Sequence, residues 1–216
     1  MKTITLLITS LLALGFSTSA FSDYQHHTRL KANLSGAEQV RTTQILNADG
    51  NAVTIPILGP LVTGAYGKAH FKLSPDGSML HYRLEAMGFT DDSPLFMAHI
   101  HLGTKGANGP VMLWLYGNQD IFPNSPRDDG EFTGSISGVL TSADLNPLPD
   151  FGIETFADAV ANIMHGNTYV NLHTVKNGAG ELRGQIHKKM KEHSHPPFGR
   201  KFPFGKNSPF DDDFPF

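Results

Sequence analysis

Alternating apolar and polar residues dominate the middle of the chain. The segments "GKAHFKL" and "MLHYRLEA" flank the turn signal of residues 74–77, "SPDG", and every second residue in them is apolar. This period-two pattern predicts a hairpin whose strands each bury one face. A two-residue turn centred on Pro-Asp pairs Phe71 with Leu80, and it also places His70 directly opposite His81 on the solvent side. The face predicted to be buried consists of Ala69, Phe71, Leu73, Leu80, Tyr82 and Leu84.

Further strands are predicted at 96–102, 111–116, 130–140, 168–175 and 181–187, where short apolar runs or alternation recur. One helix interrupts them at 153–165, because Phe156, Val160 and Ile163 follow helical spacing and Gly166 is a natural stop. A short helical turn is expected after Thr141. Many short strands with glycine-rich turns predict an all-β fold, an antiparallel Greek-key sandwich or barrel with one inserted helix.

The two ends of the chain differ from this middle part. Lys2 precedes an apolar run over residues 4–16, and small residues follow, which predicts a signal peptide over 1–22. The run is shorter than the ~20 residues that a membrane span requires, and no later segment is apolar enough to cross a bilayer. We therefore expect an exported protein, periplasmic or secreted. Residues 188–216 are rich in Pro, Phe and charge, which predicts a disordered tail and leaves 23–187 as the domain.

Composition narrows the partners and the source of stability. The formal net charge is -3, so no overall basic field points to nucleic acid. The chain has no cysteine, so disulfides cannot stabilise it. Its stability must come from its core or from a bound metal. Oligomeric state is left open by these features.

Two histidines stand out in "AHIHLG", residues 98–103. If Ala98 and Ile100 face the core, His99 and His101 project together from the other face, about 7 Å apart at the backbone. Two imidazoles at that spacing can converge on one ion, and imidazole suits copper, zinc, nickel and iron alike. The plain alternative is that both are polar residues on a solvated strand.

A third histidine has the same parity in "TYVNLHTV". Val170 and Leu172 are predicted to face inward, so His173 points outward together with Tyr169 and Asn171. The next strand, "ELRGQIH", forms a hairpin with this one across "KNGAG". Keeping the buried faces together places either Glu181 or Arg183 opposite His173.

The quoted motifs resemble a known family, the CHRD (chordin) domain. The resemblance rests on "AHIHLGTKGANGPVMLWLY", on "GNTYVNLHTVKNGAGELRGQI" and on the earlier "LSGAEQV", and it covers about residues 30 to 188. It implies an extracellular module, because the family includes regulators of extracellular signalling proteins.

A second, more distant resemblance is to copper-zinc superoxide dismutases. "HIHLG" is similar to their copper-binding strand, and "VNLHT" with "NGAGELRGQI" is similar to their later histidine strand and closing segment. This resemblance implies that His99, His101 and His173 are copper ligands on the outside of a Greek-key barrel. No histidine follows His101 at the spacing of the bridging ligand, so no zinc site is implied. Arg183 lies near the place of the family's anion-steering arginine, although offset from it.

A fourth copper ligand is left open among water, His70, His81 and His187. Two functions follow from these readings. The first is a copper enzyme that disproportionates superoxide, a small anionic substrate, with Arg183 and Lys176 supplying local positive charge. The second is a non-catalytic extracellular binding module with a protein ligand, or a copper carrier that uses the same histidines without turnover.

Overall fold

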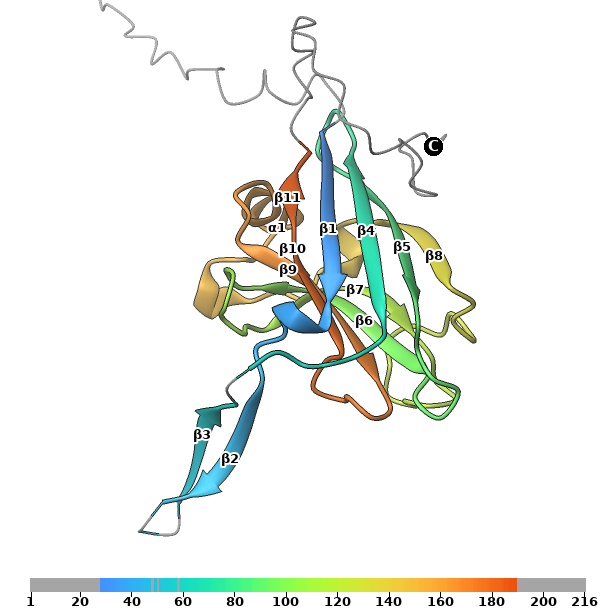
Figure 1. The fold of residues 1–216 in the computed structure, drawn as a ribbon. Coiled ribbons are helices and arrows are strands. Elements are labelled where there is room, and N and C mark those ends of the chain that lie inside the picture. Colours follow the sequence, from blue (N-terminus) through green and yellow to red (C-terminus); the bar gives the residue numbers. More distant parts are fainter. Residues whose placement is uncertain (1–27, 48, 50, 58, 190–216) are drawn as a thin grey trace, which may run out of the picture.

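The computed structural model describes residues 28–189 except 48, 50 and 58 (Figure 1). The predicted signal peptide and almost all of the predicted tail lie outside these residues. In chain order the elements are β1 (Arg29–Ser35), η3 (Gly36–Glu38), β2 (Thr42–Leu46), β3 (Ala52–Pro56), β4 (Tyr66–Leu73), β5 (Leu80–Met87), β6 (Leu95–Leu102), β7 (Val111–Gly117), β8 (Ser135–Leu140), η4 (Ser142–Asp144), η5 (Pro149–Phe151), α1 (Phe156–Met164), β9 (Thr168–Thr174), β10 (Leu182–Gln185) and β11 (His187–Lys188).

Nine strands form one antiparallel sheet that curls into a nearly closed barrel (Figure 1). The strand order is β7-β6-β9-β10-β1-β4-β5-β8, and β11 pairs with β1. The Tyr82 hydroxyl of β5 donates a 2.6 Å hydrogen bond to the Leu115 carbonyl of β7, and burial raises the pKa of Tyr82 to about 12. This bond joins two strands that are not neighbours in the sheet. The predicted all-β antiparallel fold with one inserted helix is confirmed.

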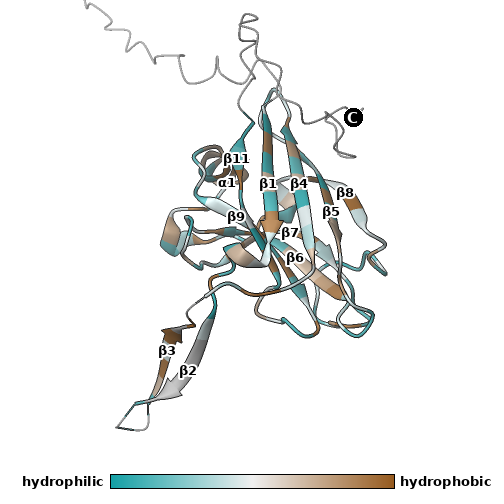
Figure 2. Cartoon of the chain, viewed as in Figure 1, coloured by the Kyte–Doolittle hydropathy of each residue, from teal (hydrophilic) through white to brown (hydrophobic). Residues whose placement is uncertain are grey.

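The core follows the predicted alternation. All six hairpin residues expected to face inward are buried, and each is at most 2 % exposed. Hydrophobic and hydrophilic residues alternate along β1 and β4 in Figure 2. Helix α1 adds Phe156, Ala159, Val160 and Ile163 to the same core. The barrel interior is therefore apolar, and the polar chemistry lies on the outer face of the sheet.

The β4–β5 hairpin has the predicted faces but a different register. Leu73 pairs with Leu80, and His70 lies opposite Arg83, so the predicted His70–His81 pair is wrong. The reason is the turn: Gly77 adopts a φ of 73°, and the Ser74 amide bonds to the Met79 carbonyl at 2.9 Å. This six-residue closure is longer than a two-residue turn, and it shifts the register by two residues without changing which face is buried.

One helix boundary and one unpredicted hairpin differ from expectation. Helix α1 begins at Phe156, three residues later than predicted, because Thr155 and Asp158 form a capping box. The short helical turn expected after Thr141 is present as η4 with its own capping box. The hairpin of β2 and β3 was not predicted. It forms a separate two-stranded sheet that projects from the barrel (Figure 1).

Candidate metal centre

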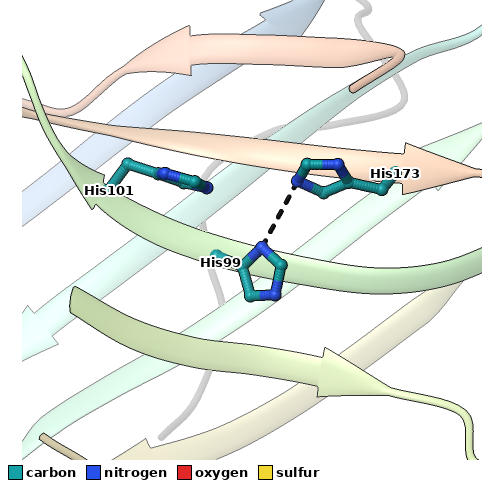
Figure 3. Close-up of side chains that lie close together, drawn as sticks. All are labelled: His99, His101 and His173. Carbon is teal, nitrogen blue, oxygen red and sulfur yellow. Dashed lines mark hydrogen bonds between the residues drawn. The ribbon is translucent and has the colours of Figure 1, made fainter. Parts of the chain in front are cut away.

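Antiparallel pairing of β6 with β9 brings the three histidines together. Ile100 lies opposite Val170, and both are fully buried in the core. The neighbouring positions therefore project from the outer face of the sheet. His99 and His101 come from β6 and His173 from β9, and Figure 3 shows their rings directed toward one another.

The imidazoles are close enough to share one ion. One ring nitrogen from each of His99, His101 and His173 lies within 4.8 Å of the other two. His99 Nδ1 and His173 Nε2 are 3.3 Å apart, the contact drawn as a dashed line in Figure 3. Among the described residues, these three histidines form the one group of three or more histidine or acidic side chains that are close enough together to hold a metal ion.

Two backbone carbonyls set the tautomers of two of these rings. His101 Nδ1 lies 2.9 Å from the Gly109 carbonyl, and His173 Nδ1 lies 3.0 Å from the Gly178 carbonyl. A carbonyl oxygen only accepts, so each Nδ1 carries the proton and each Nε2 keeps its lone pair. Fixing one ring nitrogen in this way is the usual means by which proteins orient a metal-binding histidine.

Two nitrogen atoms at the site lack hydrogen-bond partners. His99 Nε2 and His101 Nε2 are buried, and neither has a partner among the described residues. For His101 the atom without a partner is the one that bears the lone pair. The ring of His99 also meets Trp114 of β7 at 4.1 Å and almost at a right angle. His101 Nε2 is thus a bare nitrogen, whereas His99 Nδ1 and His173 Nε2 contact each other, and a donor set of three imidazoles fits a borderline transition metal.

The histidines are buried, although they face away from the barrel core. His99, His101 and His173 are 2 %, 8 % and 6 % exposed, so the alternative of polar residues on a solvated strand is wrong here. Burial lowers the pKa of His99 to about 2 and that of His101 to about 4, and it also lowers the pKa of His173. All three rings are therefore neutral at pH 7, the form that binds metal.

Arg183 holds the loop of residues 104–109, which contacts His101. Its guanidinium donates to Asn108 Oδ1 at 3.0 Å and to the carbonyls of Thr104 and Ala107 at 3.0 and 2.9 Å. The side chain is 1 % exposed. This loop ends at Gly109, whose carbonyl accepts from His101. Arg183 thus donates its hydrogen bonds to atoms of this loop and not to the histidines.

Tyr169 connects Arg183 to the histidines. The Tyr169 ring stacks on His101 with centroids 4.9 Å apart and planes 10° apart, and the Arg183 guanidinium carbon lies 3.5 Å from the Tyr169 centroid. The Tyr169 hydroxyl accepts from the Gly109 amide at 3.2 Å. Sequence reasoning missed the supporting roles of Tyr169, Gly109, Gly178 and Trp114. The Asn-Gly-Pro turn directly after the histidine strand was the available signal for Gly109.

The other predicted residues lie elsewhere. His70 and His81 are on the outer face of β4 and β5, and His187 of β11 pairs with Lys31 of β1. None of these three belongs to the described histidine group. Lys176 forms an ion pair with Asp92.

The predicted alternatives for the position opposite His173 are resolved by the β9–β10 register. Arg183 lies opposite Asn171, and the Glu181 amide bonds to the Leu172 carbonyl at 2.7 Å, so Glu181 is the nearer of the two. The Glu181 carboxylate accepts from Thr63 and Thr174, both at 2.5 Å. Glu181 is thus bound to a loop threonine and to the last residue of β9, and not to the imidazoles.

The fold and the site define a nearly closed antiparallel β-barrel with a buried three-histidine cluster on its outer face. The family model of the CHRD domain matches residues 30–186, and the chain belongs to this family. CHRD domains are extracellular binding modules. A search of curated proteins and a search of solved structures each returned no match. Within the described residues, no helix has both the length and the apolar character needed to cross a bilayer.

Proposed function

We propose that this chain is an exported CHRD-domain protein that binds one copper ion through His99, His101 and His173. The observation that supports the proposal is the set of three buried imidazoles with ring nitrogens within 4.8 Å of one another. Copper(II) forms the most stable complexes of the divalent first-row metals with nitrogen donors, and no thiol is present to favour another metal.

We further propose that the site disproportionates superoxide, so that two superoxide ions and two protons give dioxygen and hydrogen peroxide. Copper, when bound, supplies the one-electron redox chemistry that this reaction needs. The residues of the chain supply the rest. Gly109 and Gly178 hold His101 and His173 in the metal-binding tautomer. His101, at 8 % exposed, is the most accessible of the three ligands, which suits a very small substrate.

Arg183 contributes positive charge without touching the substrate. Its guanidinium is engaged by loop oxygens, yet its charge is felt at His101, where it adds to burial in lowering the pKa. A fixed positive charge beside the site favours the approach of an anion. Arg183 therefore attracts superoxide through its electrostatic field, without the direct contact to the anion that the resemblance implies.

The alternative function is copper carriage or protein binding without turnover. It is favoured by the near-complete burial of His99 and His173, which restricts access, and by membership of a family of binding modules. In that case the metal stabilises the domain or is delivered elsewhere.

Copper loading and a superoxide assay separate these functions. The purified protein is loaded with copper(II), the metal content is measured, and the EPR spectrum is recorded for nitrogen hyperfine coupling. The matched pair of variants is His101→Gln at the site and His81→Gln on the outer face of β5. We expect one copper per chain in the wild type and in His81→Gln, and at least a tenfold weaker affinity in His101→Gln.

The superoxide assay decides between the two functions. Metal-dependent consumption of superoxide that is lost in His101→Gln supports the enzyme. Stoichiometric copper without turnover refutes superoxide dismutation and leaves carriage or structural stabilisation. Failure to bind copper at micromolar concentration refutes the metal site itself.

A further inference from the structure

The β2–β3 hairpin stands apart from the barrel sheet (Figure 1). We call residues 42–62 the arm. Among the described residues, β2 and β3 pair only with each other. Residues 51–54 are exposed, and β3 is largely hydrophobic in Figure 2. An isolated two-stranded hairpin is at best marginally stable in water, so the arm would gain stability from a further strand.

The base of the arm is fixed to the barrel at both of its chain ends. The Asn108 side chain donates to the Val40 carbonyl at 2.9 Å, and the Leu61 amide donates to the Gly36 carbonyl at 3.2 Å. The arm therefore leaves the barrel from a defined place. Its strand edges remain available because, within the described part of the chain, neither edge pairs with the barrel sheet.

The hydrogen-bond pattern of the hairpin shows which backbone groups of β2 point away from β3. The Ile57 amide donates to the Arg41 carbonyl, and the Asn47 amide donates to the Asn51 carbonyl, both at 2.9 Å. In an antiparallel pair, hydrogen-bonded positions alternate with positions whose amide and carbonyl point outward. The outward positions of β2 are therefore Thr42, Gln44 and Leu46.

The two edges of the arm differ in their ability to accept a further strand. The outward positions of β3 are Ala52, Thr54 and Pro56, and proline has no amide to donate. Proline is one of the means by which sheet edges are protected from pairing. The β2 edge keeps the amide and the carbonyl at each of its outward positions. It is therefore the edge of the arm that can pair fully.

We propose that two copies of this chain associate through their β2 edges. Antiparallel pairing about a two-fold axis at Gln44 places Thr42 of each copy opposite Leu46 of the other. Each outward position then exchanges two hydrogen bonds with its counterpart, because the same donors and acceptors face each other. The two arms form one four-stranded sheet in the order β3-β2-β2-β3, and the two-fold axis keeps Val53 and Ile55 of both arms on one face.

A second copy fits this edge better than other occupants do. Asp49 is the one charged residue of the arm, so the arm has little to attract a charged partner, and it lacks the charged side chains that usually prevent edge pairing. The arm has 21 residues, and a stable interface takes about 20–30 residues from each partner. Residues 190–216 suit the edge less well, because five of them are prolines. The three histidines are not involved, so the dimer and the copper site stand or fall separately.

The first test compares proline at the two edges of the arm in the full chain. Gln44 and Thr54 lie directly opposite each other, and the amide of each points away from the hairpin. Gln44→Pro and Thr54→Pro therefore make the same change on the β2 edge and on the β3 edge, without removing a β2–β3 hydrogen bond. Sedimentation velocity at about 1–100 µM protein measures the dissociation constant of the dimer. We expect a dimer in the wild type and in Thr54→Pro, and a constant at least about tenfold larger in Gln44→Pro, which loses a central amide in each copy.

The second test uses the absence of cysteine from the chain. In the proposed dimer the two Gln44 Cα atoms are about 5.5 Å apart, within the range of a disulfide, whereas the two Thr54 Cα atoms are separated by about 14 Å. Under mild oxidation, Gln44→Cys should form a disulfide-linked dimer, and Thr54→Cys should show no cross-link on non-reducing gels.

The proposal is overturned if the wild type stays monomeric at about 100 µM, which would leave the arm to a different partner. A wild-type dimer that Gln44→Pro preserves also overturns it, because the β2 edge is then not the interface. If both proline variants are monomeric, the cysteine pair decides. A cross-link in Gln44→Cys alone then supports the β2 edge, and any other result overturns it.

Discussion

Lowering the pH from 7 to 5 is expected to destabilise the metal-free protein, because its three clustered histidines are buried without charge. An unperturbed histidine has a pKa of 6.5, whereas burial lowers the pKa to about 4 for His101 and about 2 for His99. Between these values the unfolded chain binds protons that the folded protein does not. The free energy of unfolding therefore falls as the pH falls below 6.5, and the contribution is fully present above that pH.

The size of the effect follows from the difference in pKa. At pH 5, an imidazole that is protonated only in the unfolded state costs RT ln(1 + 10^1.5), or about 2 kcal/mol. His99 and His101 together therefore cost about 4 kcal/mol, and His173 acts in the same direction. This is a large share of the ~5–15 kcal/mol that stabilises a typical domain. Carboxylates contribute little in this window, because unfolded Asp and Glu titrate near pH 4.

Urea denaturation of the chelator-treated protein at pH 7.0 and pH 5.0 measures this loss. His101→Gln should remove about half of the two-residue effect, since only His99 then remains of the pair. Copper added at pH 7.0 should raise the unfolding midpoint by mass action. A free energy of unfolding that is equal within 1 kcal/mol at the two pH values would show that the histidines are not held neutral by burial, and would refute the reasoning.

Three further substitutions test the supports of the site and the core. Gly109→Ala places a Cβ atom 1.7 Å from the Leu102 carbonyl oxygen, so we expect copper binding to become at least tenfold weaker in a competition titration. The control is Gly178→Ala, which has open space at its Cβ and should bind copper normally. Normal copper binding by both glycine variants would show that the position of the Gly109 loop does not affect copper affinity. Arg183→Lys should weaken copper binding about 10–100-fold, because the loop of residues 104–109 loses the planar fork that holds it, and an unchanged copper affinity would contradict this role. Ile100→Ala should lower the free energy of unfolding by about 3 kcal/mol in urea titrations, and a loss below 1 kcal/mol would contradict its full burial.

The local alternation of apolar and polar residues predicted the buried faces of the hairpin strands. The alternation in 67–73 and 79–86 predicted which faces are buried, and the structure confirms all six predicted core positions. A shift of two residues in register leaves the faces unchanged, which is why the faces were right while the His70–His81 pair was wrong. The extra residues were absorbed by Gly77 and the Ser74–Met79 closure, a feature of turn geometry that period-two reasoning does not resolve.

The β2–β3 hairpin shows the opposite case. Its strands lie outside the barrel sheet, so the one-sided burial that marks the barrel strands is not required of them. A local signal was present in "NADGN", where the Asn47 side chain accepts from the amides of Asp49 and Asn51. The turn residues of "NADGN" alone, with no alternating apolar pattern on either side, were too weak a signal to predict the β2–β3 hairpin.

For the candidate site, the sequence by itself determined that His99 and His101 share one strand face, because side chains alternate and Ile100 must enter the core. Only the tertiary structure decided that His173 lies beside them, since β6 and β9 are separated by more than sixty residues and meet through sheet pairing. It also decided that these rings are buried, since Trp114, Tyr169 and the carbonyls of Gly109 and Gly178 lie against them. Parity is a property of the local backbone, whereas burial and tautomer depend on which distant groups pack against each ring.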